Sequence, residues 1–234
     1  MTLAIVGMRL NGYLRGYYAI APAVAGLVVL ATLYGGGVTR PEEAYGVSAL
    51  VLFPVLAWQA QILFNSEPDV QRRLVRLAAG TAAREITTGL LAAAVAALPT
   101  LVVALILPWV FRSVGTVELD DGVAPLSLGA ALAVGVWAHL LVIPAAIALG
   151  GFASRAVSRS RAIGVVVLVV GSLLAILLGL EASPVPWLAP PLMATARSAT
   201  QGISGAGVWW LTVWAAAWSA VAIAGYWRIR LRRP

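Results

Sequence analysis

Long apolar segments recur along the chain and are separated by shorter polar connections. A membrane-spanning helix needs about 20 predominantly apolar residues. Six segments of about this length are present, at 17–34, 45–64, 86–110, 128–149, 162–180 and 208–227. The pattern predicts an all-α membrane protein with six transmembrane helices.

Arginine is unevenly distributed among the connections between these segments. The chain has 16 basic residues, all of them arginine. The termini, the second-to-third connection and the fourth-to-fifth connection hold Arg9, Arg15, Arg72, Arg73, Arg76, Arg84, Arg155, Arg159, Arg161, Arg228, Arg230, Arg232 and Arg233. The other three connections hold only Arg40, Arg112 and Arg197. Basic residues gather in cytoplasmic loops, so we expect both termini to be cytoplasmic.

Composition excludes most soluble classes of protein. The chain is 61% hydrophobic and 11% charged, whereas soluble domains are about 45–50% apolar and about 25% charged. We therefore expect a single transmembrane domain over residues 1–234. Without cysteine or lysine the chain can form neither a thiolate metal site nor a Walker A loop. The net charge of +7 is explained by membrane topology, and no nucleic-acid partner is expected.

Residues 1–16 are predicted to form an interfacial helix before the first span. Leu3, Val6, Leu10 and Leu14 recur at helical spacing, and Arg9 lies off that face. Such a helix lies in the membrane interface with its apolar side toward the lipid. The alternative is a frayed tail whose arginines reach the headgroups.

The connection 65–85 has the pattern of a short cationic helix. Its apolar positions Val70, Leu74 and Leu77 share one face, its basic positions share the other, and Gly80 ends it. On the cytoplasmic side, such a helix suits docking of a partner protein or contact with anionic headgroups. The pattern leaves both possibilities open.

The connection 181–207 is too apolar for a free loop and too rich in proline for a span. Irregular backbone at membrane depth is tolerated where protein or water surrounds it. We therefore predict an outer re-entrant hairpin between the fifth and sixth spans. The acidic pair Asp120 and Asp121, in the preceding outer connection, is expected to lie in a solvated loop.

Three polar residues within the spans are candidates for a substrate path. His139 lies near the middle of the fourth span, and Gln59 and Gln61 lie near the inner end of the second. Polar side chains in a membrane face protein or water rather than lipid. Each of the three either contacts a substrate or bonds to a neighbouring helix. No arrangement of catalytic residues is evident.

Small residues recur at every fourth position in the fifth span, at Gly171, Ala175 and Gly179. This spacing lets two helices approach closely. The three residues are candidates for a subunit interface, with an internal helix contact as the alternative.

The order of these features resembles the permease subunits of ABC-2 type exporters, over essentially the whole chain. The segments EPDVQRRL at 67–74 and AREI at 83–86 are similar to the first cytoplasmic loop of that family. The segment PWLAPPLM at 186–193, followed by Ala196 and Arg197, is similar to the family's segment before the sixth span.

The resemblance implies partners and roles. Two permease chains, identical or homologous, would pair with two cytoplasmic ABC ATPase subunits, which would bind ATP and Mg²⁺; this chain would hold no cofactor and would not be an enzyme by itself. The predicted helix in 65–85 would couple to the ATPase through Val70, Arg72, Arg73, Leu74, Arg76 and Leu77. The outer gate would include Pro190, Pro191, Leu192 and Arg197.

The family moves drugs, natural products, lipids, lipid-linked glycans and peptides, so the resemblance implies export of a hydrophobic or amphipathic small molecule. The lysine-free, alanine- and arginine-rich sequence is typical of a GC-rich bacterium, which would place the chain in a bacterial plasma membrane. The alternative function is a non-transporting scaffold or regulatory subunit of a larger membrane complex.

Overall fold

The computed structural model describes residues 2–115, 126–202 and 204–232. These residues form helices and no strand, apart from one isolated bridge between Thr39 and Val114. The elements are α1 (Thr2–Arg15), α2 (Ile20–Tyr34), α3 (Pro41–Asn65), α4 (Asp69–Ala79), α5 (Ala82–Val110), α6 (Leu128–Ala153), α7 (Arg155–Ser158), α8 (Arg161–Leu178), η1 (Pro186–Leu188), α9 (Leu192–Gln201) and α10 (Gly205–Leu231). The predicted all-helical class is confirmed for this part of the chain. Asp120, Asp121 and Arg233 lie outside it.

Five of these helices are long and apolar enough to cross a membrane: α3, α5, α6, α8 and α10. A sixth crossing exists only if α1 and α2 count as one broken span, because the pair bends by 74° between Arg15 and Ile20. The bend passes through Tyr17, which has a positive φ of 58°. The predicted first span, 17–34, is therefore shorter in the structure, since α2 has 15 residues.

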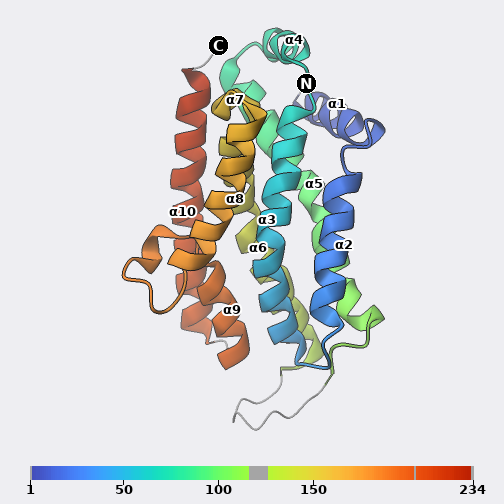
Figure 1. Cartoon of the computed structure of the whole chain (residues 1–234), viewed down its shortest axis with the longest axis vertical. Helices are drawn as coiled ribbons and strands as arrows, with labels where there is room; N and C mark the ends of the chain where they lie inside the picture. Colours follow the sequence, from blue (N-terminus) through green and yellow to red (C-terminus); the bar gives the residue numbers. More distant parts are fainter. Residues whose placement is uncertain (1, 116–125, 203, 233–234) are drawn as a thin grey trace.

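One end of the bundle carries α1, α4, α7 and the C-terminal end of α10, and we call it the α4 end (Figure 1). The long helices run side by side between this end and the opposite one. The predicted arginine-rich connections thus share one end. That this end faces the cytoplasm stays a prediction.

Helix α3 is the centre of the bundle, because it contacts α2, α5, α6, α8 and α9. In its most apolar stretch 61% of the residues are buried inside the protein, against 17% for α8 and for α10. A Cβ atom at Gly150 of α6 would lie 2.5 Å from the carbonyl oxygen of Ala57 and 2.7 Å from Cβ of Ala60, both on α3. The absence of a side chain at Gly150 therefore allows the two helices to touch backbone to backbone.

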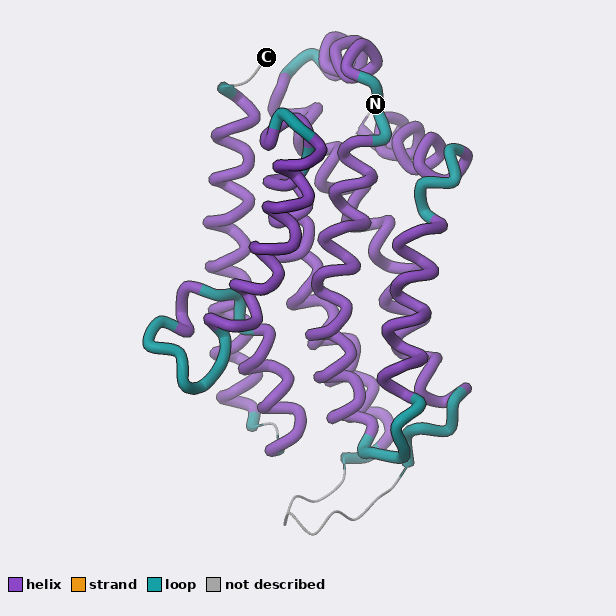
Figure 2. Tube along the Cα trace, in the orientation of Figure 1, coloured by secondary structure: helices purple, strands orange, loops and turns teal. Residues whose placement is uncertain are grey.

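The segment between α8 and α10 is folded rather than extended. The connection after α8 leaves the bundle part-way along its length, as Figure 2 shows, and η1 lies within it. The following helix, α9, packs against α3, and its Leu192 and Ala196 are buried. Packing explains the apolar residues of α9, whereas Trp187 and Leu188 of η1 are exposed. Its depth in a bilayer, and so the predicted re-entrant character, stays a prediction.

Candidate functional site

Helix α4 presents large apolar side chains to the outside of the protein. Val70, Leu74 and Leu77 are 71%, 60% and 77% exposed. The helix is held on the bundle by its other side, where Val75 and Ala79 are buried in one apolar cluster with Ile5 of α1. The predicted apolar face is therefore the free face, and smaller residues make the attachment.

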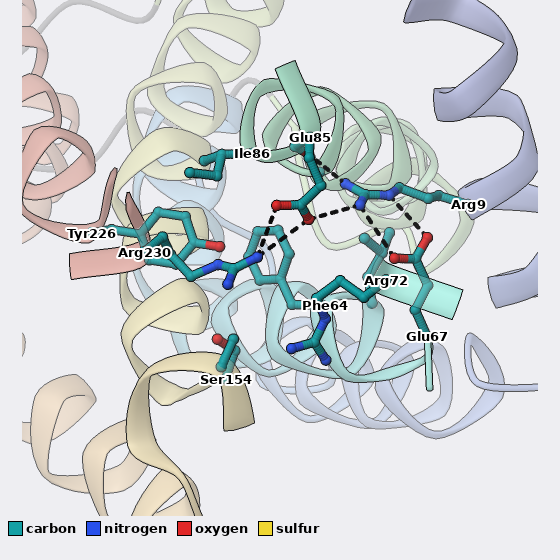
Figure 3. Close-up of a pocket in the computed structure, with 12 residues that line it drawn as sticks. Arg9, Phe64, Glu67, Arg72, Glu85, Ile86, Ser154, Tyr226 and Arg230 are labelled. Atoms are coloured by element: carbon teal, nitrogen blue, oxygen red, sulfur yellow. Dashed lines mark hydrogen bonds and ion pairs between the residues drawn. The ribbon is translucent and has the colours of Figure 1, made fainter. Parts of the chain in front are cut away.

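The three arginines of α4 do not act as one group. Arg73 is exposed and Arg76 is half-buried, and both line a surface groove of about 540 Å³ beside Leu77 and the end of the helix. Arg72 instead lines a small polar space inside the α4 end, close to Glu67 (Figure 3). The resemblance implies one partner-facing surface for all three arginines, whereas only Arg73 and Arg76 line the groove at the surface.

Five charged side chains line that polar space, and the hydrogen bonds described next join four of them, which come from distant parts of the chain (Figure 3). Arg9 of α1 donates two hydrogen bonds to the carboxylate of Glu67, at 2.9 and 3.2 Å. It also donates to Glu85 at the start of α5, at 3.0 Å to the carboxylate and 3.0 Å to the backbone carbonyl. Arg230 near the end of α10 donates to both carboxylate oxygens of Glu85, at 3.2 and 2.9 Å. We call these four residues the ion cluster.

The ion cluster is neutral and buried. Its members are between 5% and 8% exposed, and two guanidinium groups balance two carboxylates. Taking charges out of water costs several kcal/mol per ion, and attraction offsets this only when the geometry is good and the hydrogen bonds are satisfied. Here each carboxylate accepts from at least one guanidinium in a short, charge-assisted bond. Loss of any one member would leave the other three with one uncompensated buried charge.

The space between these side chains is too small for a ligand. Its volume is about 20 Å³, which is room for about one water molecule. Phe64 and Tyr226 close it on the side away from α1, with their ring centroids 5.8 Å apart. The ion cluster is therefore a joint between helices rather than a binding site. It links α1, the connection from α3 to α4, α5 and α10.

The sequence predicts none of these ion pairs. Arg9 and Arg230 count there as topology signals, and Glu85 as part of the entry to the third span. A signal was nevertheless present: Glu67 and Glu85 stand among the arginines of the predicted cytoplasmic side, where acidic residues are few. Which arginine each one meets depends on contacts 58 to 145 residues apart in the chain.

The three polar candidates for a substrate path all have partners within the protein. His139 is 1% exposed, with Nδ1 2.8 Å from the Gly135 carbonyl and Nε2 3.3 Å from the Ser48 hydroxyl. Gln59 donates to the carbonyl of Ala96 at 2.6 Å and accepts from Thr100. Gln61 donates to the carbonyl of Ala153 at 2.9 Å and also lines a surface groove beside α8. Each of the three side chains thus forms a hydrogen bond to a neighbouring helix. Of the three, only Gln61 also lines one of the grooves described here.

The small residues of α8 face other helices of the same chain. A Cβ atom at Gly171 would lie 2.5 Å from Leu149 of α6, and one at Gly179 would lie 3.2 Å from Met193 of α9. Ala175, between them, is 7% exposed. The geometry therefore supports the internal-contact interpretation of this repeat and offers no free surface for a second subunit there.

The predicted outer-gate residues lie at the start of α9 and along it. Pro190, Pro191 and Leu192 are buried, and Arg197 donates to the carbonyl of Gly179 at 3.3 Å. These contacts hold the segment after η1 against α8. Whether it opens as a gate stays a prediction.

Among the residues that the structure describes, no group of three or more His, Asp or Glu side chains is arranged so that it could hold a metal ion.

No family model, no curated protein and no solved structure matches the chain.

Proposed function

We propose that this chain is the transmembrane permease subunit of an ATP-driven exporter of the ABC-2 type. The observation that carries the proposal is the exposed apolar face of α4, made of Val70, Leu74 and Leu77. Three large apolar side chains on a short helix at the end of a membrane bundle are costly to leave in water, at roughly 1.5–3 kcal/mol for each one that could be buried. A partner protein that covers them, and that meets Arg73 and Arg76 beside them, accounts for the surface.

The ion cluster gives this surface a mechanical connection to the spans. Glu67 lies two residues before α4. It is bonded to Arg9, which is bonded to Glu85 at the start of α5. Glu85 in turn holds Arg230 of α10. A partner that pushes on α4 would therefore move α1, α5 and α10 as a group. This is the property that a coupling element needs.

The proposed partners are those that the resemblance to ABC-2 type permeases implies, since a chain without lysine offers no Walker A loop of its own. Two cytoplasmic ABC ATPase subunits would bind ATP and Mg²⁺ and dock on α4, and a second permease chain, identical or homologous, would complete the translocation path. The α4 end would then be cytoplasmic, in a bacterial plasma membrane. The cargo would be a hydrophobic or amphipathic small molecule moving outward.

Purification from the native cells tests the proposal. The tagged chain, extracted in mild detergent, should retain an ABC ATPase that mass spectrometry identifies and that hydrolyses ATP in a vanadate-sensitive manner. Replacing Leu74 and Leu77 together by glutamate should reduce the retained ATPase at least tenfold. The matched control is Leu231→Glu, since Leu231 is an exposed apolar residue at the same end but lies on α10.

Three results would speak against the proposal. Absence of any ATPase from the wild-type preparation would refute the whole assignment. Equal loss of ATPase in the control and the α4 variant would show that α4 is not the docking surface. A retained ATPase whose turnover no amphipathic substrate stimulates, in proteoliposomes, would favour the alternative, a non-transporting scaffold or regulatory subunit.

A further inference from the structure

A second polar site lies at the α4 end, on the surface of the bundle and separate from the ion cluster. It is a groove of about 450 Å³ over α3, between α2 and α8, which flank α3 in Figure 1. This volume is within the range of small-molecule sites. We call it the α2–α8 groove.

The groove has a basic rim and an apolar wall. Arg155 and Arg161 line it, together with Asn65, and none of the described residues around it is acidic. Ala21, Ile62 and Val165 line it further along the helices. The rim lies where α3 ends and where α2 and α8 begin. If these helices span the membrane, their ends lie near the change from headgroups to acyl chains. Charge and apolarity are therefore arranged along the groove in the order in which a phospholipid presents them.

The arginines of the rim are positioned but not neutralised. Asn65 accepts the backbone N–H of Arg155 at 2.9 Å through its side chain, and its carbonyl accepts from the guanidinium at 3.4 Å. Within the residues that the structure describes, neither Arg155 nor Arg161 forms an ion pair. A guanidinium presents several donors in a fixed plane and matches a phosphate in a bidentate manner. Two such groups at one rim favour a lipid headgroup with a net negative charge over one whose phosphate is already balanced by its own cation.

The bent connection between α1 and α2, residues 16–19, forms the rest of the rim; we call it the elbow. Tyr17 and Tyr18 line the groove, and Tyr17 holds a φ of 58°, a left-handed conformation that side-chain-bearing residues rarely adopt. Strained backbone of this kind persists where the surroundings demand it. Tyrosine is enriched at the membrane–water interface because its ring is apolar and its hydroxyl is polar. The elbow thus places two interfacial side chains beside the arginines.

We propose that the α2–α8 groove binds an anionic phospholipid, with the phosphate on Arg155 and Arg161 and an acyl chain along Ala21, Ile62 and Val165. The site is independent of the proposed transport function, because it needs neither an ATPase nor a second permease. Attraction of an anionic lipid by one arginine near the surface is worth about fivefold in affinity. Removing both should therefore weaken binding by roughly 10- to 30-fold.

Native mass spectrometry of the purified chain tests this with dioleoyl-phosphatidylglycerol, against dioleoyl-phosphatidylcholine as the zwitterion. The wild type should bind phosphatidylglycerol with at least a tenfold lower half-saturating concentration. The double variant Arg155→Gln with Arg161→Gln should lose this preference. The control pair Arg159→Gln with Arg228→Gln, which removes the same charge from exposed arginines at the same end but outside the groove, should keep it.

Two further experiments distinguish a lipid-binding groove from a site for soluble phosphates. The comparison of the two arginine pairs distinguishes it from an effect of general surface charge. Ala21→Trp, which fills the apolar wall without changing charge, should weaken phosphatidylglycerol binding several-fold while the unfolding temperature in lipid-free detergent stays unchanged. Glycerol 3-phosphate at 10 mM should not displace the lipid, since it lacks an acyl chain; displacement would show a site for soluble phosphates and overturn the lipid assignment. Equal losses in the two arginine pairs would reduce the effect to general surface charge, and no loss in either would show that these arginines do not hold the lipid; each result would overturn the proposal.

Discussion

Arg230, near the last residue of α10, donates hydrogen bonds to both carboxylate oxygens of Glu85, at the first turn of α5. The two residues are 145 positions apart in the chain. Glu85 also accepts from Arg9 at 3.0 Å, so one carboxylate holds the first and the last of the described helices. The negative charge also lies at a helix N-terminus, where the helix dipole favours it.

The first prediction concerns this carboxylate. Replacing Glu85 by alanine leaves two buried guanidinium groups with only Glu67 to balance them. Removing one partner of a buried ion pair costs about 3–5 kcal/mol. For a chain of this size that corresponds to a fall of roughly 6–20 °C in unfolding temperature, measurable by tryptophan fluorescence in detergent. Glu181→Ala, at an exposed carboxylate, should change the temperature by less than about 1–2 °C, a range typical of surface changes. A Glu85 variant as stable as this control would show that the ion cluster contributes nothing to stability.

The sequence predicts the spans well because their signal is local. Each of the helices α3, α5, α6, α8 and α10 is a long run of apolar residues that can be recognised without knowing its neighbours. The break at Tyr17 is harder to foresee, since it depends on one residue in a left-handed conformation within an apolar run. The chain therefore shows a 15-residue α2 where the pattern predicts a full first span.

The candidate site is only partly local. The helix at 69–79, its end at Gly80 and its apolar face at Val70, Leu74 and Leu77 follow from spacing alone, whereas only the structure shows that this face is exposed. The ion cluster does not follow from spacing, because any of the 13 arginines predicted on the same side could pair with Glu67 or Glu85. The choice of Arg9 and Arg230 is made by the tertiary packing of α1 and α10 against α5. The spacing of residues in the sequence does not predict that packing.

The second prediction tests how α4 ends. Gly80 has a φ of +79°, and a Cβ atom there would meet nothing within 4 Å, so alanine is disfavoured by backbone conformation alone. The expected cost is about 1 kcal/mol, which should speed amide hydrogen exchange in α4 about fivefold. Gly129→Ala is the control, because that site is equally open but lies within α6 without a positive φ; exchange at the start of α6 should become slower. Unchanged exchange in α4 would mean that Gly80 does not limit its opening.

The third prediction concerns the closest approach of α3 and α6. A methyl group at Gly150 would meet Ala57, Ala60 and the backbone nitrogen of Gln61 at 2.5 to 2.8 Å. These atoms cannot rotate away, so Gly150→Ala should separate the helices and cost about 1–3 kcal/mol. In Gly171→Ala the nearest atom is the end of the Leu149 side chain, also at 2.5 Å, which can move. Thermal unfolding should therefore show a larger loss for Gly150→Ala, and equal losses would indicate that α3 and α6 adjust freely.

The fourth prediction separates a structural from a transport role for His139. Its ring bonds to Gly135 and Ser48, and Ser48 is fully buried. Ser48→Ala leaves Nε2 of the ring unsatisfied, which costs about 1–3 kcal/mol. Ser48→Ala and His139→Ala should each lower the unfolding temperature, and the double variant should lose less than the two losses added together, because the residues are coupled. If the chain transports as proposed, the order of preference among transported compounds should be unchanged in proteoliposomes at a temperature where all variants stay folded. A changed order with unchanged stability would instead place His139 in contact with the cargo.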